Sequence, residues 1–263
     1  MTLLSDTRYV FIRYMKKLVR TPILLFFSLF QPILFLALFT QLLTKLGDIP
    51  GILPAGVGYL EFAAAGILMQ NAFGSALQSG NSIVADIDSG FLQKMLVTPV
   101  SRSAILLGRL TSDAFRVVIQ TAIILVLAYV LGAAAGTPFS VKTGAIGILL
   151  IFFTLAFFGL AWSGISLALG MKTRSSETVF AIGGVITFPL LFLSPALFPI
   201  NFLPSWVGTV SMFNPVSYAV NASRAFMITG YDWGTILPAW GVIGLVAVIT
   251  MSATLYQFRK VVS

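Results

Sequence analysis

Few residues of this sequence could do chemistry. The 263-residue chain contains eight acidic residues, no His and no Cys. It therefore lacks the commonest general base, the commonest metal ligand and any thiolate. It also lacks the G-x-x-x-x-G-K-[ST] loop that cradles phosphates, so we expect it to bind no ATP by that route and to hold no metal or cofactor of its own. These absences argue against catalysis by this chain.

One cluster of charges could form ion pairs. Arg109, Asp113 and Arg116 are four and three residues apart, which places them on one face of a helix. We interpret them as a salt-bridge ladder near the edge of a membrane. Secondary transporters and proton pumps usually place ionisable groups inside the bilayer. No acidic or basic residue lies in the middle of an expected span of this chain. We therefore expect the energy source to lie on another subunit.

A second set of polar residues follows one face of an otherwise apolar segment, residues 62–85. Asn71, Ser75, Gln78 and Ser82 recur there at helical spacing. Polar groups that face lipid are costly, so these side chains favour the lining of a transport pathway. Hydrogen bonding between neighbouring helices is an equal alternative.

The segment 83–109 is the most specific part of the sequence. It contains two acids, a glycine, an apolar set at helical spacing and a closing Thr-Pro turn. A short amphipathic helix of this kind offers an apolar ridge to a soluble partner. The alternative is a helix that rests on lipid headgroups. The residues assigned to partner coupling are Asp86, Asp88, Gly90, Phe91, Leu92, Lys94, Met95, Leu96, Thr98, Pro99 and Arg102.

The elements that must position these residues are membrane helices. Hydrophobic residues make up 58% of the chain and charged residues 9%, whereas a soluble domain has about 25% charged residues. A span needs roughly 20 apolar residues. The sequence therefore predicts an all-α integral membrane protein, a single domain of residues 1–263. Its six transmembrane helices are expected at residues 23–44, 62–85, 117–141, 143–171, 178–196 and 233–258.

The Lys and Arg residues predict the orientation. With six spans, twelve of them fall on the side of both termini and three on the opposite side. Basic residues are retained on the cytoplasmic side, so both termini are expected in the cytoplasm. The predicted location is the prokaryotic cell (inner) membrane, as a multi-pass protein.

Residues 3–21 are expected to form an interfacial amphipathic helix. Arg13, Lys16, Lys17 and Arg20 fall within one arc of this helix, opposite apolar side chains. Such a helix lies in the plane of the membrane. It could serve as an anchor on anionic lipid, or it could also brace a cytoplasmic partner.

Residues 196–230 are expected to form an outer re-entrant hairpin between spans five and six. Recurrent prolines prevent a straight span, and non-helical backbone at membrane depth must be buried against protein or water. An ordinary external loop with aromatic anchors is the alternative. Arg224 is expected to pair with Asp232 or with a lipid phosphate. The residues assigned to the hairpin or gate are Pro199, Leu203, Pro204, Trp206, Asn214, Pro215, Tyr218 and Arg224.

Two stretches carry a family resemblance. Residues 90–102 read GFLQKMLVTPVSR, and residues 198–227 contain L-P-x-W followed by N-P-x-x-Y-A-V. Both resemble motifs of the ABC type-2 permeases, especially the daunorubicin-resistance-like drug exporters, and both lie between the spans where that family has them. Asp86 and Asp88 stand where the family commonly has Glu, and Phe91 stands where it often has Thr.

The resemblance implies the permease of an ATP-driven ABC exporter that moves an amphipathic or lipid-like substrate, such as a drug-like molecule, a lipid or a glycan-lipid. It implies six spans per subunit and cytoplasmic ABC ATPase subunits that hold ATP and Mg. A permease homodimer or related heterodimer and membrane lipid are the other expected partners, with no nucleic acid. A non-transporting membrane anchor or regulator of an ATPase is the alternative; a membrane-embedded enzyme is disfavoured by the missing His and Cys.

Overall fold

The computed structural model describes residues 3–43, 45, 49, 53, 57–98, 100–137 and 139–262. Within these ranges the chain forms helices and no strand. The long helices are α1 (Leu3–Arg20), α2 (Pro22–Leu42), α3 (Tyr59–Asp88), α5 (Arg102–Ala134), α6 (Gly144–Thr173), α7 (Ser176–Phe192) and α10 (Trp233–Val262). The short ones are α4 (Phe91–Leu96), the 3-10 turn Ile200–Phe202, α8 (Ser205–Ser211), α9 (Pro215–Arg224) and the π-helical turn Ala225–Thr229.

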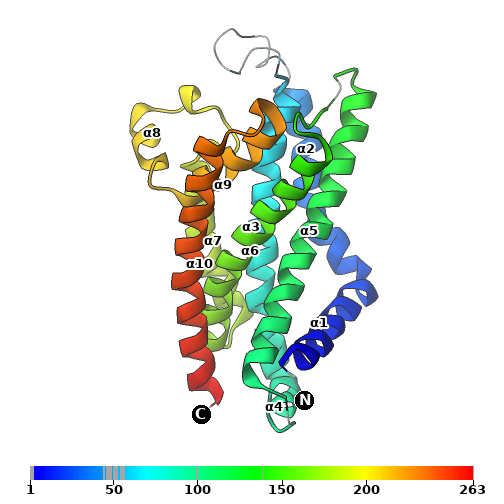
Figure 1. Cartoon of the computed structure of the whole chain (residues 1–263), viewed down its shortest axis with the longest axis vertical. Helices are drawn as coiled ribbons and strands as arrows, with labels where there is room; N and C mark the ends of the chain where they lie inside the picture. Colours follow the sequence, from blue (N-terminus) through cyan, green and yellow to red (C-terminus); the bar gives the residue numbers. More distant parts are fainter. Residues whose placement is uncertain are drawn as a thin grey trace.

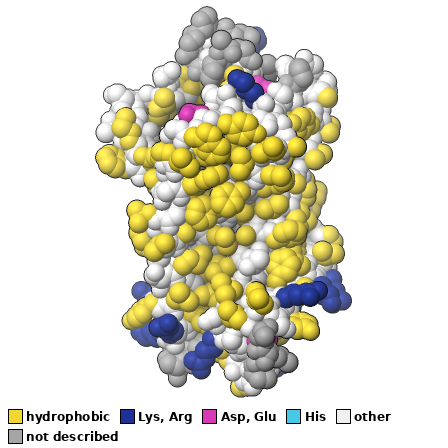
Figure 2. Space-filling view, viewed as in Figure 1, with side chains coloured by type: hydrophobic (Ala, Val, Ile, Leu, Met, Phe, Trp, Pro, Cys, Tyr) yellow, Lys and Arg dark blue, Asp and Glu magenta, His cyan; other side chains and the backbone are white. Residues whose placement is uncertain are grey.

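The long helices form an elongated bundle with chemically different ends. Figure 1 shows both termini and α4 at one end, and α8 and α9 toward the other. Lys and Arg side chains gather at the end with the termini, and hydrophobic side chains cover the middle of the visible face (Figure 2). We call these the basic end and the far end. This distribution is typical of a protein whose middle lies in hydrocarbon.

In the described part of the chain, four helices are long and apolar enough to cross a membrane, namely α2, α5, α6 and α10. The helix α7 is apolar but has only 17 residues. The helix α3 has 30 residues. It carries the four polar residues predicted to share one helix face, which we call the polar stripe: Asn71, Ser75, Gln78 and Ser82. Most of α3 is buried, so its polar groups face protein rather than lipid.

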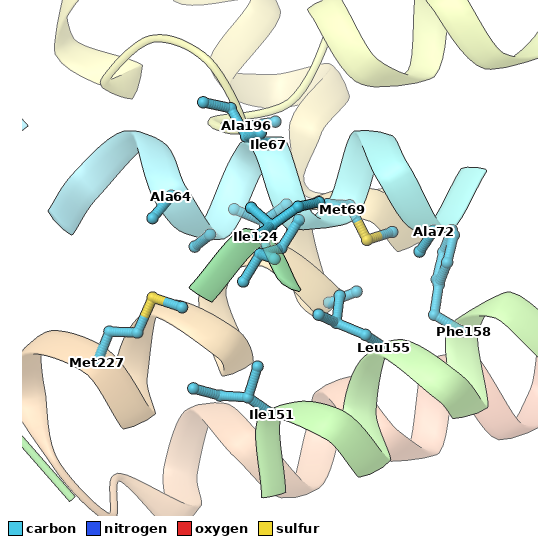
Figure 3. Packing of buried hydrophobic residues seen from close by; sticks show 14 of the residues in the cluster. Ala64, Ile67, Met69, Ala72, Ile124, Ile151, Leu155, Phe158, Ala196 and Met227 are labelled. Carbon is cyan, nitrogen blue, oxygen red and sulfur yellow. The ribbon is translucent and has the colours of Figure 1, made fainter. Parts of the chain in front are cut away.

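The core is built where α3 packs against α6, and α6 in turn packs against α10. Phe73 of α3 meets Phe158 and Trp162 of α6 edge-on, with ring centroids 5.0 Å and 4.8 Å apart. Ile67 of α3 and Ile124 of α5 are completely buried in the same core (Figure 3). Edge-to-face aromatic pairs add to the gain from apolar burial, so α3 is held rigidly inside the bundle.

The expected interfacial helix at residues 3–21 is present as α1, which packs against α5. Val10 and Tyr14 are its buried hydrophobic residues. Asp6 is also buried, and its carboxylate accepts a hydrogen bond from the backbone N–H of Ser101 at 3.3 Å. Two members of the basic arc, Arg13 and Lys17, also lie within 3.6 Å and 3.9 Å of the Asp86 carboxylate, so α1 attaches to the bundle through both apolar and charged side chains.

The connection between α3 and α5 is shorter than expected. The sequence predicted a loop over residues 83–109 and a span beginning at residue 117, because charged residues interrupt the apolar window before it. In the structure α3 continues to Asp88 and α5 begins at Arg102. The helices therefore extend into both ends of the predicted loop, and α5 includes Arg109, Asp113 and Arg116 because these charges are paired.

Candidate functional site

A cavity of about 370 Å³ lies toward the basic end, with walls from α1, α2, α3 and α5. Ser75, Gln78 and Ser82 of the predicted polar stripe line it. Asn71 contacts the wall from behind, because its Nδ2 donates to Oε1 of Gln120, a lining residue, at 3.4 Å. The structure thus brings all four predicted pathway residues to one place.

The polar stripe divides into two parts with different surroundings. Asn71 and Ser75 are buried, and Ser75 Oγ accepts a hydrogen bond from Arg116 Nε at 2.9 Å. Gln78 and Ser82 are only partly buried beside the cavity. Asn71 and Ser75 therefore join α3 to α5 by hydrogen bonds, which matches the alternative interpretation of the stripe as contacts between helices. Gln78 and Ser82 remain able to meet a ligand.

A buried charge network closes the basic side of this cavity. Asp86 near the end of α3 accepts a hydrogen bond from Arg109 Nη1 of α5 at 2.9 Å. The Tyr14 hydroxyl of α1 donates to the same carboxylate oxygen at 2.7 Å. Burial raises the pKa of Tyr14 to about 12, so the hydroxyl keeps its proton. The network therefore ties α1, α3 and α5 together.

The network also reaches α4 through Arg13. The guanidinium of Arg13 lies 3.6 Å from Asp86 and covers the ring of Phe91, 3.3 Å from its centroid. A cation over an aromatic face is attracted by the ring quadrupole. A movement of α4 is thereby linked, through Arg13 and Asp86, to the wall of the cavity.

The charge cluster on α5 is only partly the ladder that the spacing predicted. Arg116 pairs with Asp113 at 3.0 Å, as expected. Arg109 pairs instead with Asp86, which is 23 residues away in the sequence, and Asp113 accepts a hydrogen bond from Ser79 Oγ. The expectation of an Arg109–Asp113 pair was therefore wrong, because α3 supplies a closer carboxylate.

The residues assigned to partner coupling separate into exposed and buried groups. Gly90 has a φ of 66°, a left-handed conformation that glycine adopts without strain, and this turn directs α4 away from the axis of α3. Phe91, Met95 and Leu96 are half-buried. The exposed members are Asp88, Lys94, Thr98 and Arg102.

Two of these residues lie inside the protein rather than on its surface. Asp86 is 3% exposed and Leu92 is 1% exposed, so in this structure neither can contact a partner. Leu92 packs in a small hydrophobic cluster with Ile105 of α5 and Met171 of α6. Pro99 lies outside the described residues. Val97, which follows α4 and is 86% exposed, is an apolar side chain at this surface that the sequence reasoning missed.

The chain after α7 is irregular and is anchored to the bundle by side chains. Asn214 donates from Nδ2 to the backbone oxygens of Leu190 and Leu193 at 2.6 Å and 3.0 Å. The Tyr59 hydroxyl donates to the oxygen of Leu197 at 3.0 Å. These bonds satisfy carbonyl groups that a helix would otherwise pair, as burial requires.

A close backbone approach fixes the same segment. Ala196 is completely buried, and a Cβ built on Gly66 of α3 would overlap its carbonyl group. Only glycine leaves room for this approach. Sequence inspection missed Gly66 because an isolated glycine in a helix gives no sign of what lies against it.

Arg224 does not pair with Asp232 in the structure. Its Nη2 donates to the backbone oxygen of Pro195 at 2.8 Å, and its guanidinium lies 3.8 Å from the ring centroid of Phe62. Asp232 instead accepts from Gly234 N and Thr235 Oγ1 at the start of α10. The expected pairing was wrong because backbone carbonyl groups near α3 are closer to Arg224.

The other residues assigned to the hairpin range from buried to exposed. Pro199 and Asn214 are buried, whereas Leu203, Pro215 and Tyr218 are half-buried. Pro204 and Trp206 are exposed on α8 or just before it. The anchored part of residues 196–230 therefore lies against α3 and α7, and α8 extends outward from it (Figure 1).

Comparison with known proteins places these features in a family context. Residues 5–228 match the family described as ABC-2 type transporter. The chain is 29% identical over 241 residues to a daunorubicin resistance ABC transporter permease of Streptomyces coeruleorubidus, covering 91% of this chain and 81% of that protein. It is 33% identical over 218 residues to a protein of Cyanophora paradoxa named as a transport permease, ycf38, covering 82% and 72%.

Proposed function

The chain belongs to the ABC-2 type transporter family, and from this premise we propose that it is the permease of an ATP-driven exporter whose ATPase is a separate cytoplasmic subunit. The observation that carries the proposal is the connection between α4 and the cavity. Phe91 is held by Arg13, which contacts Asp86, and Asp86 holds Arg109 in the cavity wall. A force applied to α4 by a partner would reach the pathway along these contacts.

The proposed topology has six spans, α2, α3, α5, α6, α7 and α10, with the basic end in the cytoplasm of a prokaryotic cell. The support is the gathering of Lys and Arg at the end that carries both termini (Figure 2), because basic residues are retained on the cytoplasmic side. In this arrangement α1 lies at the cytoplasmic surface, and residues 196–230 form a re-entrant hairpin at the outer end.

Cysteine labelling in intact cells tests this topology, since the chain has no native Cys. We expect Ser103→Cys, which is exposed at the start of α5, to react with a membrane-impermeant maleimide only after the cells are opened. Ser205→Cys, exposed at the start of α8, should react in intact cells. Labelling of Ser103→Cys from outside would contradict the orientation.

The proposed substrate is an amphipathic or lipid-like molecule, and the drug-resistance names of relatives support a drug-like one. Gln78 and Ser82 provide polar contacts in the cavity, and the apolar bundle surrounds them. A pathway for such a molecule would run between the permease and a second permease copy, which is the proposed homodimer. The hairpin would close its outer end.

Reconstitution of the complete transporter tests the function. We expect the chain alone to hydrolyse no ATP, and the chain with its ABC ATPase to accumulate daunorubicin in proteoliposomes only with ATP. Phe91→Ala with Met95→Ala should weaken ATPase binding by about 1–3 kcal/mol and reduce transport, because it removes the half-buried apolar side chains of α4.

The matched control is Gln93→Ala, which changes an exposed polar residue of the same helix and should leave binding and transport unchanged. Normal ATPase binding by the double variant would refute the coupling role of α4. Sustained ATP hydrolysis by the chain alone, free of contaminating ATPases, would refute the separate energy source.

A further inference from the structure

The cavity at the basic end carries an excess of positive charge. Lys17, Arg109 and Arg116 line it, and Asp113 is the one acid among its described lining residues. Asp86, just behind the wall, is shared by Arg109 and Lys17, whose Nζ lies 3.9 Å away. Arg109 is paired with Asp86 and Arg116 with Asp113, which leaves Lys17 as the lining cation that can meet an anionic ligand.

The wall also contains polar atoms without partners. Asn81 is 8% exposed and lines the cavity, yet neither its amide nitrogen nor its amide oxygen has a hydrogen-bond partner among the described residues. Arg109 Nε is another buried donor without one. Buried polar groups are normally satisfied, so these atoms point to a ligand that accepts from Asn81 Nδ2 and donates to Asn81 Oδ1.

One side of the cavity is apolar and leads toward a second basic space. Met15, Leu18 and Leu25 line the cavity beside its polar groups. A second cavity, of about 480 Å³, lies along α1 and shares Lys17 and Thr21 with the first. Its other cations are Arg13, Lys16 and Arg20. The first cavity is therefore charged on one side and apolar on another, and it adjoins a second cavity lined by cations.

We propose that the cavity binds an anionic phospholipid of the adjacent leaflet whose headgroup carries a phosphodiester and a hydroxyl. The phosphate accepts from Lys17 Nζ and Asn81 Nδ2, the hydroxyl donates to Asn81 Oδ1, and Met15, Leu18 and Leu25 hold the upper acyl chain. The inference rests on the proposed position of α1 at the membrane surface. It requires no transport of this lipid.

Lipid titration of the full chain tests this site. The delipidated protein is titrated with phosphatidylglycerol or phosphatidylcholine, and bound lipid is counted by native mass spectrometry. We expect phosphatidylglycerol to bind at least about tenfold more tightly, which corresponds to one charge-assisted hydrogen bond. Asn81→Leu and Lys17→Gln should each remove about tenfold of this affinity.

Lys16→Gln is the matched control, because Lys16 lines only the second cavity, and it should change the affinity less than about twofold. Variants are compared only when their thermal unfolding matches that of the unaltered chain. Equal binding of the two lipids, or full affinity in Asn81→Leu, would overturn the proposal. The proposal would also be overturned if soluble glycerol phosphate competed as strongly as phosphatidylglycerol, since the site would then bind a free anion rather than a lipid. Because the assay contains no ATPase and no transport step, its result is independent of the proposed export function.

Discussion

Replacing Asp86 with Leu is expected to destabilise the protein by about 3–5 kcal/mol, the cost of breaking a buried ion pair from one side. The carboxylate and its partner Arg109 are both almost completely buried, 2.9 Å apart. Without Asp86, Arg109 would remain in the protein interior without its nearest counter-charge, and Arg13 would lose the carboxylate 3.6 Å away. Arg109→Met should cost less, because Tyr14 still donates to the remaining Asp86.

Thermal and denaturant unfolding in detergent measure this effect. The double variant Asp86→Leu with Arg109→Met should recover most of the lost stability, because an apolar pair can replace a buried ion pair with little cost. Asp88→Ala is the matched control, since Asp88 is exposed two residues further along and should change stability by less than about 0.5 kcal/mol. Equal stability of Asp86→Leu and Asp88→Ala would show that the network contributes little.

Replacing Gly66 with Val is expected to reduce transport at least about tenfold, the effect of a shift of about 1.4 kcal/mol in a conformational equilibrium. The new side chain would meet the carbonyl of Ala196 and push the segment after α7 away from α3. Overpacking of this kind costs about 1–3 kcal/mol. The displacement would also break the hydrogen bonds from Tyr59 to Leu197 and from Arg224 to Pro195.

Substrate efflux, normalised to assembled transporter, is the measurement. Gly241→Val provides the control, because a Cβ at Gly241 in α10 meets nothing within 4 Å. Membrane insertion and ATPase binding should remain normal in both variants, since Gly66 lies toward the far end, away from α4. If Gly66→Val transported as well as Gly241→Val, the anchored segment would have no part in export.

The helices could be predicted because hydrophobic length and periodicity determine them. The expected helix at residues 3–21 corresponds to α1, and the expected span at 143–171 corresponds to α6 (Gly144–Thr173). The start of α5 could not be predicted in the same way. A charge-free window excludes Arg109 and Asp113, but both are tolerated in a helix whose neighbours supply Asp86 and Ser79.

The site could be predicted only where a regular spacing revealed it. The stripe of Asn71, Ser75, Gln78 and Ser82 was visible because its members recur at helical spacing. Asn81 lies off this stripe, and its importance depends on the cavity beside it. The contacts of Arg224 could not be predicted either, because a sequence does not show which backbone carbonyl groups will lie near a side chain.

The short length of α7 has a consequence for the surrounding lipid. At about 1.5 Å per residue, its 17 residues extend about 26 Å, whereas the hydrocarbon layer is about 30 Å thick. Beyond Phe192 the chain turns inward against α3 instead of continuing outward. In the proposed six-span topology, the bilayer would accommodate this hydrophobic mismatch by thinning beside α7, at a fraction of a kcal/mol per Å. Longer acyl chains would raise that elastic cost, so in this topology membrane thickness itself would become a variable that acts on the far end of the protein.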